Sequence, residues 1–307
     1  MRRTTEGPVV PDGLPASLDA DVPARRRRRI LRLSTLPAAL TLGNLVCGVL
    51  AISYVADATA LSASGDAAGA SALLARAGWL ILLGMVFDGF DGSVARMVRS
   101  TSHFGSALDS LADVVSFGVA PALVAKALMD GALGIDRPRM TFLTAAFFAV
   151  CACLRLARYN AEHDAQEPHE ADEPEAGVTS FSGLPTPGAA GVVAGAALVH
   201  RQVLEWWDLD VAWKLGFAYA LGFGVLAGLG LLMVSRVPYV HFANRFLHGR
   251  KSVGGVALLF FALMLVLNFD TTLVLAVTFA AYAASGPLLV LPRLFRGRPA
   301  ELPELFD

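Results

Sequence analysis

The feature that most constrains this chain is a series of apolar runs, each long enough to cross a lipid bilayer. A spanning helix needs about 20 mostly apolar residues. Runs of this kind lie near residues 36–56, 71–95, 106–130, 140–158, 187–204, 213–234, 253–269 and 271–291. Backbone N–H and C=O groups in lipid must be paired within the protein, and a single run of this length can pair them only as a helix. We therefore predict an all-α fold, a polytopic membrane helix bundle with about eight transmembrane helices.

The composition supports this interpretation and excludes several others. Only 17% of the 307 residues are charged, whereas soluble domains carry about a quarter. The three cysteines, Cys47, Cys151 and Cys153, lie inside apolar runs, where a buried thiol is expected and a disulfide framework is not. The sequence contains no nucleic-acid-binding motif, so we expect membrane lipid rather than nucleic acid as a partner.

The charged residues divide the chain into regions. We expect a disordered basic arm at 1–33, a membrane-embedded catalytic domain at 34–292 with an acidic cytoplasmic loop at 161–180, and a C-terminal cytoplasmic tail at 293–307. Most Lys and Arg residues fall on the side of the membrane that would also hold the N-terminus. Because positive residues are enriched in cytoplasmic loops, we expect both termini and the active site on the cytoplasmic face of the cell membrane.

Four aspartates stand at the adjoining ends of the second and third runs. Asp88 and Asp91 are three residues apart, and Asp109 and Asp113 are four apart, so each pair shares one helix face. The short connection between the two runs makes their helices antiparallel neighbours, which brings the pairs together. Carboxylates at membrane depth are costly, and four of them would repel one another. A bound Mg²⁺ or Mn²⁺ would relieve both penalties, because these ions prefer oxygen ligands.

Two other roles for the aspartates are helix capping and cation transport. Helix capping would explain one aspartate, but not four at matched spacing. A cation transporter would place acidic residues near the middle of the bilayer and spread them over several helices. Here they cluster at two consecutive helix ends, which favours a catalytic metal site.

The spacing of these residues resembles the signature of the CDP-alcohol phosphatidyltransferase family. The matching positions are Asp88, Asp91, Gly92, Ala95, Arg96, Gly105, Asp109 and Asp113. The resemblance implies that the four aspartates coordinate two divalent ions, with Asp113 also acting as the general base. It implies that Gly92, Ala95, Arg96 and Gly105 line the CDP site. It further suggests a six-helix catalytic core and a homodimer.

Other segments indicate the acceptor alcohol. Residues 41–48, 116–121, 155–160 and 181–187 resemble the phosphatidylserine synthase branch of the family. This resemblance implies that CDP-diacylglycerol and L-serine are the substrates and that CMP is released. The same fold acting on glycerol 3-phosphate or an inositol phosphate remains the alternative.

Three further polar residues are candidate substrate ligands. Arg155 and Arg158, at the expected cytoplasmic end of the fourth run, could contact the serine carboxylate or a substrate phosphate. They could equally be anchors whose side chains extend to lipid headgroups. Asn44, in the otherwise apolar first run, could reach the nucleotide or bond another helix.

Overall fold

The computed structural model describes residues 24–98, 103–132, 137–164, 183–206, 220–237, 239 and 270–295. Within these ranges every regular element is helical, which confirms the predicted all-α class. The α-helices are α1 (Ala24–Ala63), α2 (Ala67–Val98), α3 (His103–Asp113), α4 (Ala120–Ala127), α5 (Pro138–Asp164), α6 (Thr186–Trp206), α8 (Leu226–Val234) and α11 (Thr271–Phe295). Three π-helical segments accompany them: η1 (Val114–Val119), η2 (Leu128–Ala132) and η3 (Ala220–Val225).

Five of the described helices are long and apolar enough to cross a membrane, so the chain is a multi-pass membrane protein. These spans are Pro37–Ala63, Ala67–Gly92, Phe104–Gly131, Pro138–Glu162 and Thr271–Leu288. They correspond to the first four and the last of the predicted runs. The fifth and sixth runs contain the shorter apolar helices Thr186–His200 and Gly222–Val234. The run at 253–269 and the start of the sixth, 213–219, lie outside the described residues.

Two predicted boundaries differ from the structure. We expected irregular chain through residue 33, but α1 begins at Ala24. We expected the acidic loop from residue 161, but α5 continues to Asp164. In both places the residues next to the span are mostly good helix formers without Gly or Pro, so the helix extends past the apolar run. The remainder of the predicted arm, loop and tail (1–23, 165–180 and 296–307) lies outside the described residues.

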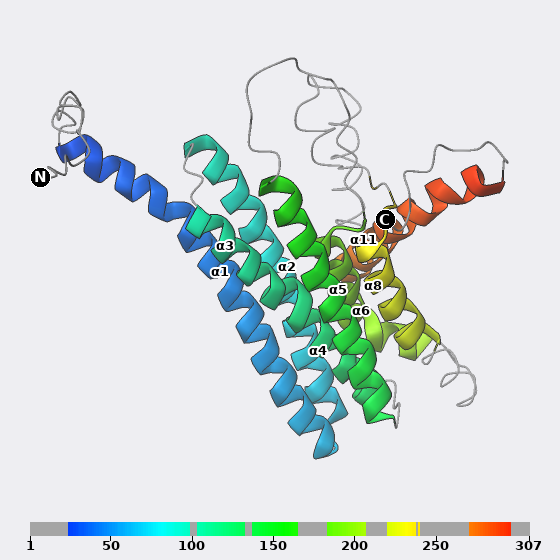
Figure 1. The fold of residues 1–307 in the computed structure, drawn as a ribbon. Helices are drawn as coiled ribbons and strands as arrows, with labels where there is room; N and C mark the ends of the chain where they lie inside the picture. The colour runs from blue at the N-terminus through cyan, green and yellow to red at the C-terminus, as the bar shows by residue number, and fades with distance from the viewer. Residues whose placement is uncertain are drawn as a thin grey trace, which may run out of the picture.

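The helices pack closely because small residues line their contacts. In Figure 1, α1, α2, the continuous helix from α3 through η2, and α5 run side by side, and α6, α8 and α11 lie against the same bundle. Ala51 of α1, Ala77 of α2, and Ala194 and Ala197 of α6 are fully buried. Small side chains let membrane helices approach closely, where dispersion forces hold them together.

The third span changes its helical register just after the last aspartate of the motif. Asp113 ends α3, and η1 follows directly with Ser116 and Phe117 buried. Pro121, in the first turn of α4, has no N–H to donate to the preceding turn. A π-helical segment replaces the i→i+4 bonds by i→i+5 bonds, which accommodates the missing donor and shifts the helical register of the residues within the segment. The π segment therefore sets the direction in which Ser116 points.

Two local devices place the later helices. Gly183 has φ +92°, and its N–H donates to the Val237 carbonyl at 2.9 Å. A Cβ there would lie 2.5 Å from the Met233 carbonyl oxygen, so only glycine allows the chain to enter α6 against the end of α8. At the start of α11, Asp270 accepts hydrogen bonds from the N–H and hydroxyl of Thr272. These bonds hold the pKa of Asp270 below its ordinary value and cap the helix.

Candidate active site

The structure brings three of the four predicted aspartates into one cluster. Asp88 and Asp91 come from the C-terminal part of α2, and Asp109 comes from α3. One carboxylate oxygen from each lies within 4.8 Å of the other two. Asp91 is only 4% exposed, and the other two are half-buried. The predicted convergence of the two helix ends is therefore present in the fold.

Asp113 lies beside this cluster, one turn further along the same helix. Its side chain is 9% exposed and interacts electrostatically with all three clustered carboxylates. The amide of Asn44 donates a hydrogen bond to its Oδ1 atom at 3.0 Å. Asp113 thus has a fixed position close to the cluster, with one oxygen held by a neutral donor from α1.

Helix α1 supports the aspartates through two polar contacts. The Thr41 hydroxyl donates to Oδ2 of Asp91 at 2.9 Å. Asn44, one turn further on, is fully buried, and its backbone carbonyl accepts a hydrogen bond from the Ser116 hydroxyl at 2.9 Å. Thr41 and Ser116 were not among the predicted site residues. Thr41 thus holds Asp91 of α2, and Asn44 holds Asp113 of α3, against the same face of α1.

The contact between α1 and η1 depends on a glycine. A Cβ at Gly48 would lie 2.4 Å from the Ser116 hydroxyl oxygen and 2.8 Å from the Ser116 Cα. Those distances are too short for any side chain, so glycine is required for this close approach. The approach in turn brings Ser116 within reach of the Asn44 carbonyl.

The residues at the cluster fit a divalent cation. The oxygens come from carboxylates, the ligands that Mg²⁺ and Mn²⁺ prefer. Oδ1 of Asp109 is buried and has no hydrogen-bond partner within the described residues. An ionised oxygen in that state is costly unless a cation or a donor satisfies it. The arrangement is therefore of the kind that holds divalent metal.

The two candidate arginines of α5 have different surroundings. Arg155 is partly buried, and its Nη1 donates to the Thr186 hydroxyl at the start of α6 at 2.9 Å. Its Nε is buried without a partner among the described residues, and the guanidinium interacts electrostatically with Asp113. Arg158 is exposed and donates to the carbonyl of Val234, the last residue of α8. Arg155 therefore joins α5 to the start of α6 and interacts electrostatically with Asp113, whereas Arg158 joins α5 to the end of α8.

The remaining predicted residues lie on the same two helices. Gly92 is half-buried near the end of α2, and Gly105 is half-buried in the first turn of α3. Ala95 and Arg96 belong to the last turns of α2, and their side chains lie outside the described part of the structure. The predicted contacts of these four residues with CDP stay a prediction.

Comparison with known proteins identifies the group to which this fold and site belong. The sequence model of the CDP-alcohol phosphatidyltransferase family matches residues 34–222. The chain belongs to this family. The matched region begins in α1, contains all four aspartates, and extends through the two arginines and α6 into η3. It thus includes every predicted site residue of this family member.

Relatives of this family member include several proteins named CDP-diacylglycerol–serine O-phosphatidyltransferase. One from Mycobacterium tuberculosis is 36% identical over 184 residues, 59% of this chain and 56% of the relative. One from Saccharomyces cerevisiae is 42% identical over 129 residues, 42% of this chain and 44% of the relative. One from Bacillus subtilis is 29% identical over 172 residues, 56% of this chain and 80% of the relative. The alignments thus span about half the length of most of these curated relatives.

Proposed function

We propose that this family member transfers the phosphatidyl group of CDP-diacylglycerol to the hydroxyl of L-serine, forming phosphatidylserine and releasing CMP. The observation that carries the proposal is that relatives from mycobacteria, Helicobacter pylori, Bacillus subtilis and yeast all bear the name of this serine-specific activity. The region that matches the family model carries the aspartate cluster, which supplies the chemistry that such a transfer needs.

Asp88, Asp91, Asp109 and Asp113 would hold divalent metal, Mg²⁺ or Mn²⁺, and the family signature implies two such ions. When bound, such ions neutralise the pyrophosphate and stabilise charge on the transferring phosphoryl group. The buried, unpartnered oxygen of Asp109 supports this assignment. Gly92, Ala95, Arg96 and Gly105, on the same two helix ends, are the residues we assign to the CDP moiety.

Asp113 is the general base of the proposed reaction. The serine hydroxyl oxygen forms a bond to the lipid-bearing phosphorus while the bond from that phosphorus to the CMP oxygen breaks. The hydroxyl proton passes to a carboxylate oxygen of Asp113, and CMP leaves with the bonding electrons. A base must lie within hydrogen-bond reach of its proton. The hydrogen bond from Asn44 supports this role by holding one oxygen of Asp113 in place.

Arg155 is the residue that we assign to the serine carboxylate. A carboxylate substrate needs a cation nearby, and an Arg–carboxylate pair is a strong, directional interaction. Arg155 is partly buried and interacts electrostatically with Asp113, and its Nε has no partner among the described residues. The surroundings of Arg158 favour the structural alternative for that residue, because its guanidinium is exposed and bonded to the end of α8.

The proposed location is the cell membrane, with the aspartate cluster and both termini on the cytoplasmic side, as the distribution of positive residues predicts. An interfacial site would let the lipid tails remain in the bilayer while a soluble nucleotide departs. A homodimer stays a prediction from the family resemblance.

The test is CMP release by the purified protein. With CDP-diacylglycerol and Mg²⁺ or Mn²⁺, we expect CMP to appear when L-serine is present. Parallel reactions contain glycerol 3-phosphate or an inositol phosphate, and Asp113→Asn serves as the inactive control. CMP release with one of the other alcohols, and none with serine, would overturn the proposed acceptor while retaining the family chemistry.

A further inference from the structure

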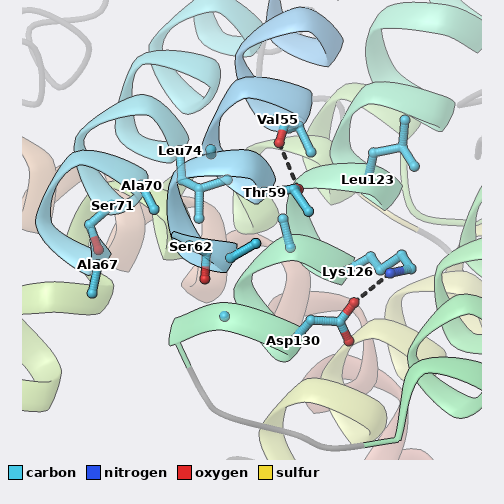
Figure 2. A pocket seen from close by; sticks show the side chains of 14 residues that line it. Val55, Thr59, Ser62, Ala67, Ala70, Ser71, Leu74, Leu123, Lys126 and Asp130 are labelled. Carbon is cyan, nitrogen blue, oxygen red and sulfur yellow. Dashed lines mark hydrogen bonds and ion pairs between the residues drawn. The ribbon is translucent and has the colours of Figure 1, made fainter. Parts of the chain in front are cut away.

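A second polar site lies at the end of the bundle opposite the aspartates. A pocket of about 480 Å³ opens between the C-terminal part of α1, the first turns of α2, and the α4–η2 helix. Figure 2 shows Ser71 of α2 on one side, Lys126 and Asp130 on the other, and Thr59 and Ser62 of α1 between them. Pockets that bind small ligands in proteins are typically about 300–1,000 Å³.

The charged groups of the pocket form a neutral pair. Lys126 and Asp130 are one helical turn apart and form an ion pair, with each side chain 30% exposed. The second oxygen of the carboxylate, Asp130 Oδ1, is buried and has no hydrogen-bond partner within the described residues. This oxygen can accept a hydrogen bond, and the ammonium group of Lys126 can donate more than one. The pocket therefore offers a positively charged hydrogen-bond donor next to a negatively charged hydrogen-bond acceptor.

The position of the pocket restricts what can occupy it. It borders the short turn between α1 and α2, so it lies where two spans leave the membrane on the side away from the aspartates. Toward the bilayer interior its walls become apolar, with Val55, Leu74 and Leu123. A polar opening above apolar walls at this depth matches the headgroup and glycerol region of a phospholipid.

We propose that this pocket binds the headgroup of a phospholipid that carries both a phosphate and a primary ammonium group. Lys126 would pair with the phosphate, and Asp130 Oδ1 would accept a hydrogen bond from the ammonium. The neutral ion pair disfavours a divalent cation or an isolated phosphate, because each would meet a like charge in the pocket. A quaternary ammonium has no N–H to donate, so it would leave the Asp130 oxygen unpaired.

The test measures thermal stabilisation of the delipidated full chain in detergent, since a ligand that binds the folded state raises the unfolding temperature. The added lipids are phosphatidylethanolamine, phosphatidylcholine and phosphatidylglycerol with identical acyl chains. Soluble phosphoethanolamine forms a fourth arm and separates a lipid headgroup from a free zwitterion. We expect phosphatidylethanolamine to bind at least about tenfold more tightly than phosphatidylcholine, a step equivalent to about 1.4 kcal/mol.

Two variants connect the binding to this pocket. Lys126→Met with Asp130→Leu removes both charges together, so neither is left buried alone. Its matched control is Arg76→Met with Asp57→Leu, which removes one charge of each sign from exposed positions on α2 and α1 at the same end of the bundle. Thr59→Leu narrows the pocket and leaves the ion pair intact, and it carries the test if the double variant fails to fold.

The pocket variants should lose the preference for phosphatidylethanolamine, and the control should keep it. CMP release should stay within about twofold of the parent in all of them. The rate changes only when the activation free energy changes, and the pocket is remote from the aspartates. Equal stabilisation by all three lipids, or an unchanged preference in both pocket variants, would overturn the proposal. Stabilisation by phosphoethanolamine but not by the lipid would also overturn it.

Discussion

Substitution of Asn44 by leucine tests how Asp113 is held. Leucine has a similar volume but cannot donate, so the carboxylate loses the 3.0 Å hydrogen bond from Asn44 while the packing of α1 is largely retained. A hydrogen bond to a charged group contributes about 1.5–3 kcal/mol. Each 1.36 kcal/mol of activation free energy changes the rate about tenfold. If the hydrogen bond makes its contribution in the transition state, kcat should therefore fall about 10- to 150-fold.

Steady-state CMP release separates this role from the alternative one. We expect KM for CDP-diacylglycerol and for serine to stay within about twofold, because an interaction made in the transition state affects kcat rather than ground-state binding. A nucleotide contact by Asn44 would instead raise KM for CDP-diacylglycerol. That result, with kcat unchanged, would refute the assignment of Asn44 as a positioning residue.

A matched control uses the same chemical change at another interhelical amide. Asn160 of α5 donates to the Ser110 hydroxyl of α3 at 2.8 Å. Asn160→Leu removes a neutral hydrogen bond worth about 1 kcal/mol of stability. We expect it to lower the unfolding temperature slightly without the large loss of kcat. An equal loss of kcat in both variants would show that general loosening of the bundle is responsible.

The remaining predictions concern the serine site and two glycines. Arg155→Ala should raise KM for serine about tenfold or more, since a charge-assisted bond is worth about 1.5–3 kcal/mol. Arg158→Ala should leave KM for serine nearly unchanged. Serine titrations of CMP release compare the two variants. Gly48→Ala should destabilise the fold by about 1–3 kcal/mol through overpacking, and Gly228→Ala on α8, where a Cβ meets nothing within 4 Å, is the control in thermal unfolding. Gly183→Ala should be at least as destabilising, because φ +92° is strained for alanine and the added carbon meets backbone oxygens.

Much of the site could be predicted from spacing because the spacing acts within single helices. Asp88 and Asp91, or Asp109 and Asp113, share a face whatever the rest of the fold does. The short connection between their helices then leaves few ways to arrange them. Carboxylates at membrane depth are rare enough that their convergence, predicted from sequence alone, indicates a metal site.

The contacts from α1 could not be predicted in the same way. Thr41 and Asn44 reach their aspartates because α1 has a particular rotation about its axis. That rotation depends on the close approach of Gly48 to Ser116 and on the π segment that directs Ser116. The position of Thr41, one turn before Asn44 in the same motif segment, is the sequence feature that could have indicated a role at the site. Its contact with Asp91, however, depends on tertiary packing.

The two arginines illustrate the same limit. Arg155 and Arg158 are three residues apart on one helix and received the same prediction from sequence. Their partners, Thr186 and Val234, come from helices that begin or end far along the chain. Only the packing of α6 and α8 against α5 distinguishes the partly buried guanidinium, which interacts electrostatically with Asp113, from the exposed one bonded to the end of α8.

The central claim is that the carboxylates of α2 and α3 bind divalent metal and that catalysis depends on it. Its most direct test is Mn²⁺ binding to the purified protein, measured by electron paramagnetic resonance alongside serine-dependent CMP release. We predict that the parent binds Mn²⁺, that chelation abolishes CMP release and added metal restores it, and that Asp91→Asn with Asp109→Asn loses both. Undiminished CMP release after complete chelation, or unchanged Mn²⁺ binding in the double variant, would contradict the claim.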